Sequence, residues 1–176
     1  MIAYLNQRLS LKTVLWLLPL AFILHDLEEV FTMAPWIATH RDALPSLFAG
    51  RMPALTSTQV TGAVGVEFVL TVLASYLGVR ALRQGRPGRL YVTVVAVLFG
   101  NVFTHLGQAL IFGGYTPGVW TAPTVALPYT TYALYRLFRA DLLTWRVLGR
   151  EALIGAAIAL PGVLTALQIG RWLFPG

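Results

Sequence analysis

LYVTVVAVLFGNVFTHLGQALIF, residues 90–112, is a run of 23 residues that contains no Asp, Glu, Lys or Arg. A helix needs about 20 consecutive, mostly apolar residues to cross the hydrocarbon core of a bilayer. The run therefore predicts a membrane-spanning helix. It also holds a histidine, His105, which a purely structural lipid-facing helix does not need.

Four further segments of the chain have the same apolar character. Hydrophobic residues make up 57% of the sequence and charged residues 11%, whereas soluble domains carry about 25% charged residues. We expect an all-α, polytopic membrane bundle of five transmembrane helices that forms one domain over residues 1–176. It is expected in a plasma membrane of the bacterial type. The predicted spans are approximately residues 11–33, 58–82, 90–112, 119–138 and 152–174.

The basic residues predict how the bundle is oriented. Ten of the thirteen lie near the start of the first span, around the connection between spans two and three, or around the connection between spans four and five. The positive-inside rule then places the N-terminus inside and the C-terminus outside. The net charge of +6 does not indicate nucleic-acid binding, because aromatic residues are not interleaved with the basic ones. No nucleotide or haem motif is found, and the absence of cysteine excludes disulfides and thiolate ligands.

Four of the seven carboxylates lie inside the predicted spans, and so do two of the three histidines. A charge in hydrocarbon costs several kcal/mol or more unless it is paired, protonated or bound. The residues are His25, Asp26, Glu28, Glu29, Glu67 and His105. Helical spacing puts most of them on inward faces, and their distances from the span ends put them in one layer, in the outer half of the bilayer.

Histidines and carboxylates on facing helices are suitable ligands for Zn²⁺, Fe²⁺ or Mn²⁺. One metal is favoured over two, because two would need nearly every acid in the layer. The residues expected to be catalytic and to bind the metal are His25, Glu28, Glu29, Glu67 and His105. The supporting residues expected around them are Asp26, Asn101, Thr104, Gln108 and Tyr115.

This ligand set predicts a membrane metalloenzyme that acts on a lipid or another apolar small molecule, with the reaction class open. Three alternatives remain. Buried acids also suit a metal-free isomerase or cyclase, in which a protonated Glu donates to the substrate. They suit a small ion or proton transporter as well, or they simply pair to hold the helices together. Tyr129, Tyr132 and Tyr135 either line an apolar pocket or pack between helices.

Two further features concern partners and access. Small residues on the fifth span (Ala152, Ala156, Ala159 and Gly162) predict a close-packing face, either within the bundle or against a second copy of the chain. The expected partners are thus membrane lipids, an apolar substrate and, as an open alternative, a homo-oligomer. The connection over residues 34–57 either covers the outer mouth of the site or serves only as a connector.

The string His25-Asp26-Leu27-Glu28-Glu29 resembles the signature of the HXXEE-domain family of integral membrane proteins. That family also has a further histidine and a Tyr-x-Pro-Gly motif, which correspond here to His105 and to Tyr115-Thr116-Pro117-Gly118. The resemblance spans most of the chain, with the three elements in order. Because the family is one of uncharacterised membrane proteins, the resemblance supplies no reaction.

Overall fold

The computed structural model describes residues 2–40 and 56–175, and in these residues the chain forms helices joined by short turns, without a strand. The all-α prediction is therefore confirmed. The elements are α1 (Ile2–Arg8), α2 (Leu11–Trp16), α3 (Leu18–Thr39), α5 (Ser57–Leu82), α6 (Arg89–Phe112), the π-helical turn η2 (Ala122–Ala126), α7 (Leu127–Arg139) and α8 (Trp145–Leu173).

Three of these helices, α5, α6 and α8, are long and apolar enough to cross a membrane, which is consistent with an integral membrane protein. Helices α5 and α6 begin within one residue of the predicted spans and end where predicted. The start of α5 is fixed by a capping box, in which the side chains of Thr56 and Gln59 each bond to the backbone N–H of the other.

The first predicted span is divided into α2 and α3 at Leu17, and α3 continues to Thr39 instead of ending at Met33. The division has a local cause. Pro19 has no N–H, so the carbonyl of Leu15, four residues earlier, loses its helical donor. The hydroxyl of Ser75 on α5 donates to this carbonyl instead, at 2.9 Å. This bond joins α2 to α5.

The fourth and fifth predicted spans also differ from the structure. The fourth is a π-helical turn followed by a short helix of 13 residues, and Pro123 and Pro128, which lack N–H donors, stand near the starts of these two elements. Helix α8 begins at Trp145, seven residues before the predicted Ala152, because the Thr144 side chain caps its first turn. Most of the connection over residues 34–57 lies outside the described residues.

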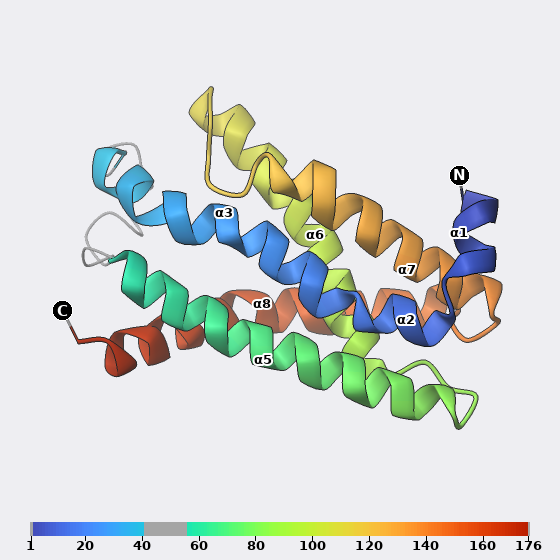
Figure 1. The fold of residues 1–176 in the computed structure, drawn as a ribbon. Coiled ribbons are helices and arrows are strands. Elements are labelled where there is room, and N and C mark those ends of the chain that lie inside the picture. The colour runs from blue at the N-terminus through green and yellow to red at the C-terminus, as the bar shows by residue number, and fades with distance from the viewer. Residues whose placement is uncertain (1, 41–55, 176) are drawn as a thin grey trace.

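Helix α5 packs against both α3 and α8, and α6 packs against α5, α7 and α8. In the view of Figure 1, α8 (red) lies between α3 (blue) and α5 (green), and α7 (orange) lies beside α2. The two termini lie at opposite ends of the bundle. The end that holds the N-terminus also holds the α5–α6 turn and the α7–α8 connection. Ten of the thirteen basic residues lie in these segments or in the adjoining ends of the helices.

Polar contacts join the helices near this end. Glu151 of α8 is almost completely buried, yet it accepts bonds from Arg89 Nε (3.0 Å), Arg150 Nη2 (2.7 Å) and Thr93 Oγ1 (2.8 Å). The Tyr129 hydroxyl lies 2.7 Å from that of Tyr91. Tyr132 and Tyr135 both bond to Asn6. The three tyrosines of α7 therefore make interhelical contacts here, away from the predicted ligands.

Candidate metal centre

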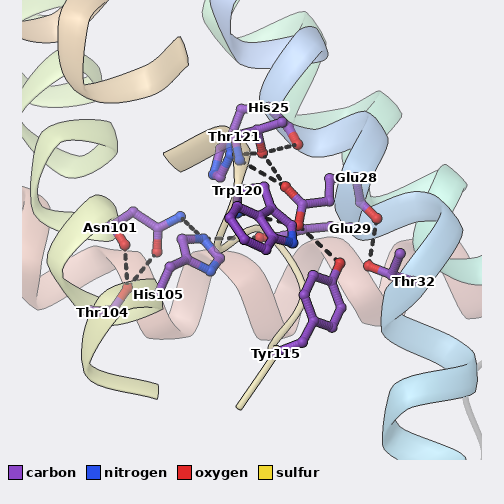
Figure 2. A network of polar contacts seen from close by, with 10 residues as sticks. All are labelled: His25, Glu28, Glu29, Thr32, Asn101, Thr104, His105, Tyr115, Trp120 and Thr121. Atoms are coloured by element: carbon purple, nitrogen blue, oxygen red, sulfur yellow. Dashed lines mark hydrogen bonds and ion pairs between the residues drawn. The ribbon is translucent and has the colours of Figure 1, made fainter. Parts of the chain in front are cut away.

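Three of the predicted ligands meet between α3 and α6. His25, Glu29 and His105 each offer one ligand atom, and these atoms lie within 4.8 Å of one another, so that the group could hold a metal ion. His25 is 1% exposed and His105 is 5% exposed. Their rings meet edge to face with centroids 5.0 Å apart. Figure 2 shows that Glu29 and His25 extend from α3 toward His105 of α6.

Glu28 faces a different partner from Glu29, namely the chain that leads into η2. Its Oε2 accepts from the Thr121 hydroxyl (2.6 Å) and the Thr121 N–H (2.8 Å), and its Oε1 accepts from the Tyr115 hydroxyl (2.9 Å) and more weakly from the Trp120 N–H (3.4 Å). Partial desolvation, together with the bond to Glu28, raises the pKa of Tyr115, which keeps its phenol protonated as a donor. Both carboxylate oxygens are thus already occupied, and Glu28 anchors this loop to α3.

The Thr121 hydroxyl also determines which nitrogen of His25 carries a proton. Its single proton goes to the nearer acceptor, Glu28 Oε2, so its oxygen must accept a bond from His25 Nδ1, which lies 2.9 Å away. Nδ1 is then protonated, and in the neutral imidazole Nε2 carries the lone pair. Nε2 is buried and has no hydrogen-bond partner among the described residues. This is the arrangement in which metal-binding histidines are usually held.

His105 is supported from its own helix. Thr104 donates to the Asn101 side-chain oxygen at 2.8 Å, and the Asn101 amide nitrogen lies 2.9 Å from His105 Nε2. The same Nε2 lies 3.1 Å from Glu29 Oε1. A carboxylate and an unprotonated ring nitrogen both carry lone pairs, so this contact is attractive only with a proton on Nε2 or a metal ion beside both atoms. The contact is therefore either an ordinary hydrogen bond from a protonated Nε2 or a pair of ligand atoms that face one metal ion.

The Tyr-x-Pro-Gly motif does more than turn the chain between α6 and η2. Tyr115 donates to Glu28, and its carbonyl accepts a bond from the Trp36 indole at 2.9 Å. Gly118 has φ +84°, and a Cβ there would clash with the imidazole of His105. The motif thus closes the group from one side and leaves room for the His105 ring.

The remaining predicted residues lie in other places. Glu67 contributes no atom to the group, and Asp26 is buried with Oδ2 unpartnered among the described residues. Both are near enough to Glu29 for their charges to interact. Gln108 is exposed on α6 and makes no hydrogen bond to the described part of the group. Asn101 contacts His105, and Thr104 contacts Asn101.

Sequence reasoning missed Thr121, which contacts both Glu28 and His25. Threonine is common in apolar segments, and helical spacing relates residues only within one helix. Thr121 lies 96 positions after His25. Its one sequence signal is its place just after the Tyr-x-Pro-Gly motif, in a segment that must return to the bundle.

Comparisons with known proteins give a family and no activity. No curated protein and no solved structure matches the sequence at a significant level. Residues 16–133 match the family described as "Protein of unknown function with HXXEE motif". The matched range contains the three clustered residues, their supports on α6 and the loop that closes over them. The chain therefore belongs to the HXXEE family.

Proposed function

We propose that the chain spans the membrane five times, with its N-terminus inside and its C-terminus outside. The positions of the termini at opposite ends of the bundle support an odd number of crossings. The collection of basic segments at the N-terminal end supports the orientation. In this arrangement α2 with α3 forms the first crossing, and η2 with α7 forms the fourth.

In this membrane domain His25, Glu29 and His105 bind one divalent metal ion. The observation that carries the proposal is the convergence of their three ligand atoms within 4.8 Å, with His25 Nε2 buried and without a partner among the described residues. One ion suits the site better than two. Both carboxylate oxygens of Glu28 already accept hydrogen bonds from the loop, and Glu67 is not part of the group.

Two histidines and one carboxylate are the ligands of catalytic zinc sites and of non-haem iron(II) sites. Such a set leaves coordination positions for water or substrate, whereas structural zinc sites are closed by four protein ligands. We therefore assign the protein to metal-dependent membrane enzymes, with Fe²⁺ and Zn²⁺ ahead of Mn²⁺. The bound ion would act as a Lewis acid or would activate oxygen ligands, according to its identity.

The substrate proposed is a lipid or another apolar small molecule. Exposed apolar side chains alternate with the ligands on both helices, for example Leu27 and Phe31 on α3 and Leu106 on α6. The Glu29 side chain retains 13% exposure. Trp120, which is 69% exposed, lies beside Glu28, toward which its backbone N–H points (Figure 2). The cavities lined by Arg136 and Arg139 and by Lys12 and Arg80 lie elsewhere in the bundle.

Elemental analysis of purified protein tests the metal site. After loading with Fe²⁺, Zn²⁺ or Mn²⁺ and removal of free ion, the wild-type chain should retain about one equivalent, and His25→Ala and His105→Ala should each retain almost none. The matched control is His40→Ala, which removes the third histidine of the chain outside the group. Retention that is equal in all four proteins would contradict the proposal.

The enzymatic part needs a separate test. Membrane extracts from cells that express wild type or Glu29→Gln are compared by mass spectrometry of apolar lipids, with and without a membrane-permeant chelator. We expect at least one species that depends on the wild-type protein and is lost with either treatment. Identical lipid profiles would contradict an enzyme acting on membrane lipids.

A second candidate is a metal-free acid–base enzyme, and one observation favours it. Asp26 is buried with an unpartnered oxygen, and its charge interacts with those of Glu29 and Glu67, so that this trio suits a shared proton. In that case the lipid product persists in chelator and is lost in Asp26→Asn and Glu67→Gln. Under the metal proposal these two variants retain the metal.

A further inference from the structure

We propose that Lys12, Arg80 and Arg83 bind the phosphate of an anionic phospholipid at the N-terminal end of the bundle. A cavity of about 360 Å³ lies between α2 and α5, and it is lined by Lys12, Trp16, Tyr76, Val79, Arg80 and Arg83. It is separate from the candidate metal centre, and nothing in the proposed function depends on it.

The three cations are available for a ligand. All three are exposed, and among the described residues none donates a hydrogen bond or forms an ion pair with a carboxylate. The arginines of the other cavity contrast with them. Arg136 donates to the Leu9 carbonyl and the Tyr132 hydroxyl, and Arg139 to the Tyr135 hydroxyl. Their charges already serve contacts within the bundle.

The cavity lining combines cationic side chains with aromatic and apolar ones, which matches the anionic headgroup and apolar chains of a phospholipid. Trp16 and Tyr76 are partly exposed at the mouth, and Arg80 lies over the Tyr76 ring with its Cζ 5.8 Å from the ring centroid. Amphipathic rings of this kind favour the headgroup level of a bilayer. The cavity is therefore built for a group whose anionic part meets cations and whose remainder enters the apolar layer.

Apolar side chains continue from the cavity along both helices. On α5, Leu73 and Leu77 share a helical face with Tyr76 and Arg80, and both leucines are exposed. On the other wall, Leu20 follows Trp16 by four residues and is also exposed. An acyl chain has a path along these leucines toward the middle of the bundle, which free phosphate does not need. This favours a phospholipid over a soluble phosphate.

Native mass spectrometry of the full chain in detergent measures this binding directly. The probes are phosphatidylglycerol, phosphatidylcholine and glycerol 3-phosphate, and the proteins are wild type, Arg83→Ala, the triple variant Lys12→Ala/Arg80→Ala/Arg83→Ala, and Arg146→Ala. Arg146 is an exposed arginine at the same end of the bundle, outside both cavities. Circular dichroism checks that each variant is folded.

We expect wild type and Arg146→Ala to bind phosphatidylglycerol in preference to phosphatidylcholine. Affinity should fall about fivefold for each cation removed. Arg83→Ala alone gives a decisive result should the triple variant fail to fold. The proposal is overturned by equal binding of the two lipids, by an unchanged affinity in Arg83→Ala, or by an equal loss in Arg146→Ala. Displacement of the lipid by an equimolar amount of glycerol 3-phosphate would identify a soluble phosphate site and overturn it too.

Discussion

Gly118 lies directly against the imidazole of His105, in a left-handed backbone conformation that leaves no room for a Cβ. Gly118→Ala should therefore displace the ring and strain the loop, at a cost of about 1–3 kcal/mol of stability. We expect a lower unfolding temperature and reduced metal retention. Gly114→Ala is the matched control in the same loop, because a Cβ there meets no atom within 4 Å. Equal effects of the two substitutions would show that the loop, and not the contact, matters.

Thr121→Val keeps the shape of the side chain and removes the hydroxyl that joins Glu28 to His25. His25 then loses the partner that fixes its tautomer, so the affinity for metal should fall about 10- to 100-fold. Competition with a chromogenic chelator measures the change. Thr121→Ser should restore most of the affinity. Thr124→Val serves as the control, since its hydroxyl bonds only to the Trp120 carbonyl among the described residues.

Glu28 and Glu29 are neighbours in sequence, but their replacement by glutamine should have different results. Glu29→Gln removes a ligand charge, so that stoichiometric metal retention should be lost. Glu28→Gln weakens bonds that anchor the loop through Tyr115 and Thr121, so that hydrogen exchange of the loop should rise while a metal ion is still bound. Loss of metal retention in both variants would place Glu28 among the ligands.

The bond from Ser75 to the Leu15 carbonyl should matter only because Pro19 provides no helical donor. In the wild-type background, Ser75→Ala removes the side-chain donor to a buried carbonyl, which costs about 1–3 kcal/mol. Pro19→Ala supplies an N–H at the position that normally serves this carbonyl, so Ser75→Ala should cost less in that background. A double-mutant cycle of thermal unfolding measures the coupling. Strict additivity of the two substitutions would contradict this explanation.

Glu151 is the buried partner of two arginines that are themselves largely exposed. Glu151→Gln should lower the free energy of unfolding by about 1–3 kcal/mol, since the arginines can regain water while the Thr93 contact is weakened. Metal retention should not change, because the residue lies away from the candidate centre. Arg146→Ala provides the baseline for loss of an exposed charge in α8. An unchanged melting curve in Glu151→Gln would contradict the stabilising role.

The helices that sequence predicted best are those whose ends coincide with clear local signals. Helices α5 and α6 follow apolar runs bounded by a capping box and by the glycine-rich turns at Gly88 and Gly113. The start of α8 was missed because hydropathy alone treats the polar first turns of a helix as a loop. The division at Leu17 was missed because its stability depends on Ser75 in another helix.

For the candidate site, the depth of a residue along its helix was easier to predict than the direction in which its helix face points. His25, Glu29 and His105 were correctly brought together, because helical spacing and distance from the span ends limited their positions. Glu67 was expected at the same depth, yet it does not join the group. Rotation of α5 about its axis depends on packing with α3 and α8, which one sequence does not supply. The role of Thr121 could not be predicted, because it rests on a loop contact with Glu28, 93 positions earlier in the chain. Helical periodicity does not relate residues so far apart.

His25 and His105 lie 80 positions apart on two helices of a chain without cysteine. An ion held by both would join distant parts of the chain as a covalent bridge does. By the entropy of closing a loop of that length, such a link restricts the unfolded chain by about 4.5 kcal/mol. The proposed metal would thus act as a reversible crosslink, one that a membrane protein can form without an oxidising compartment.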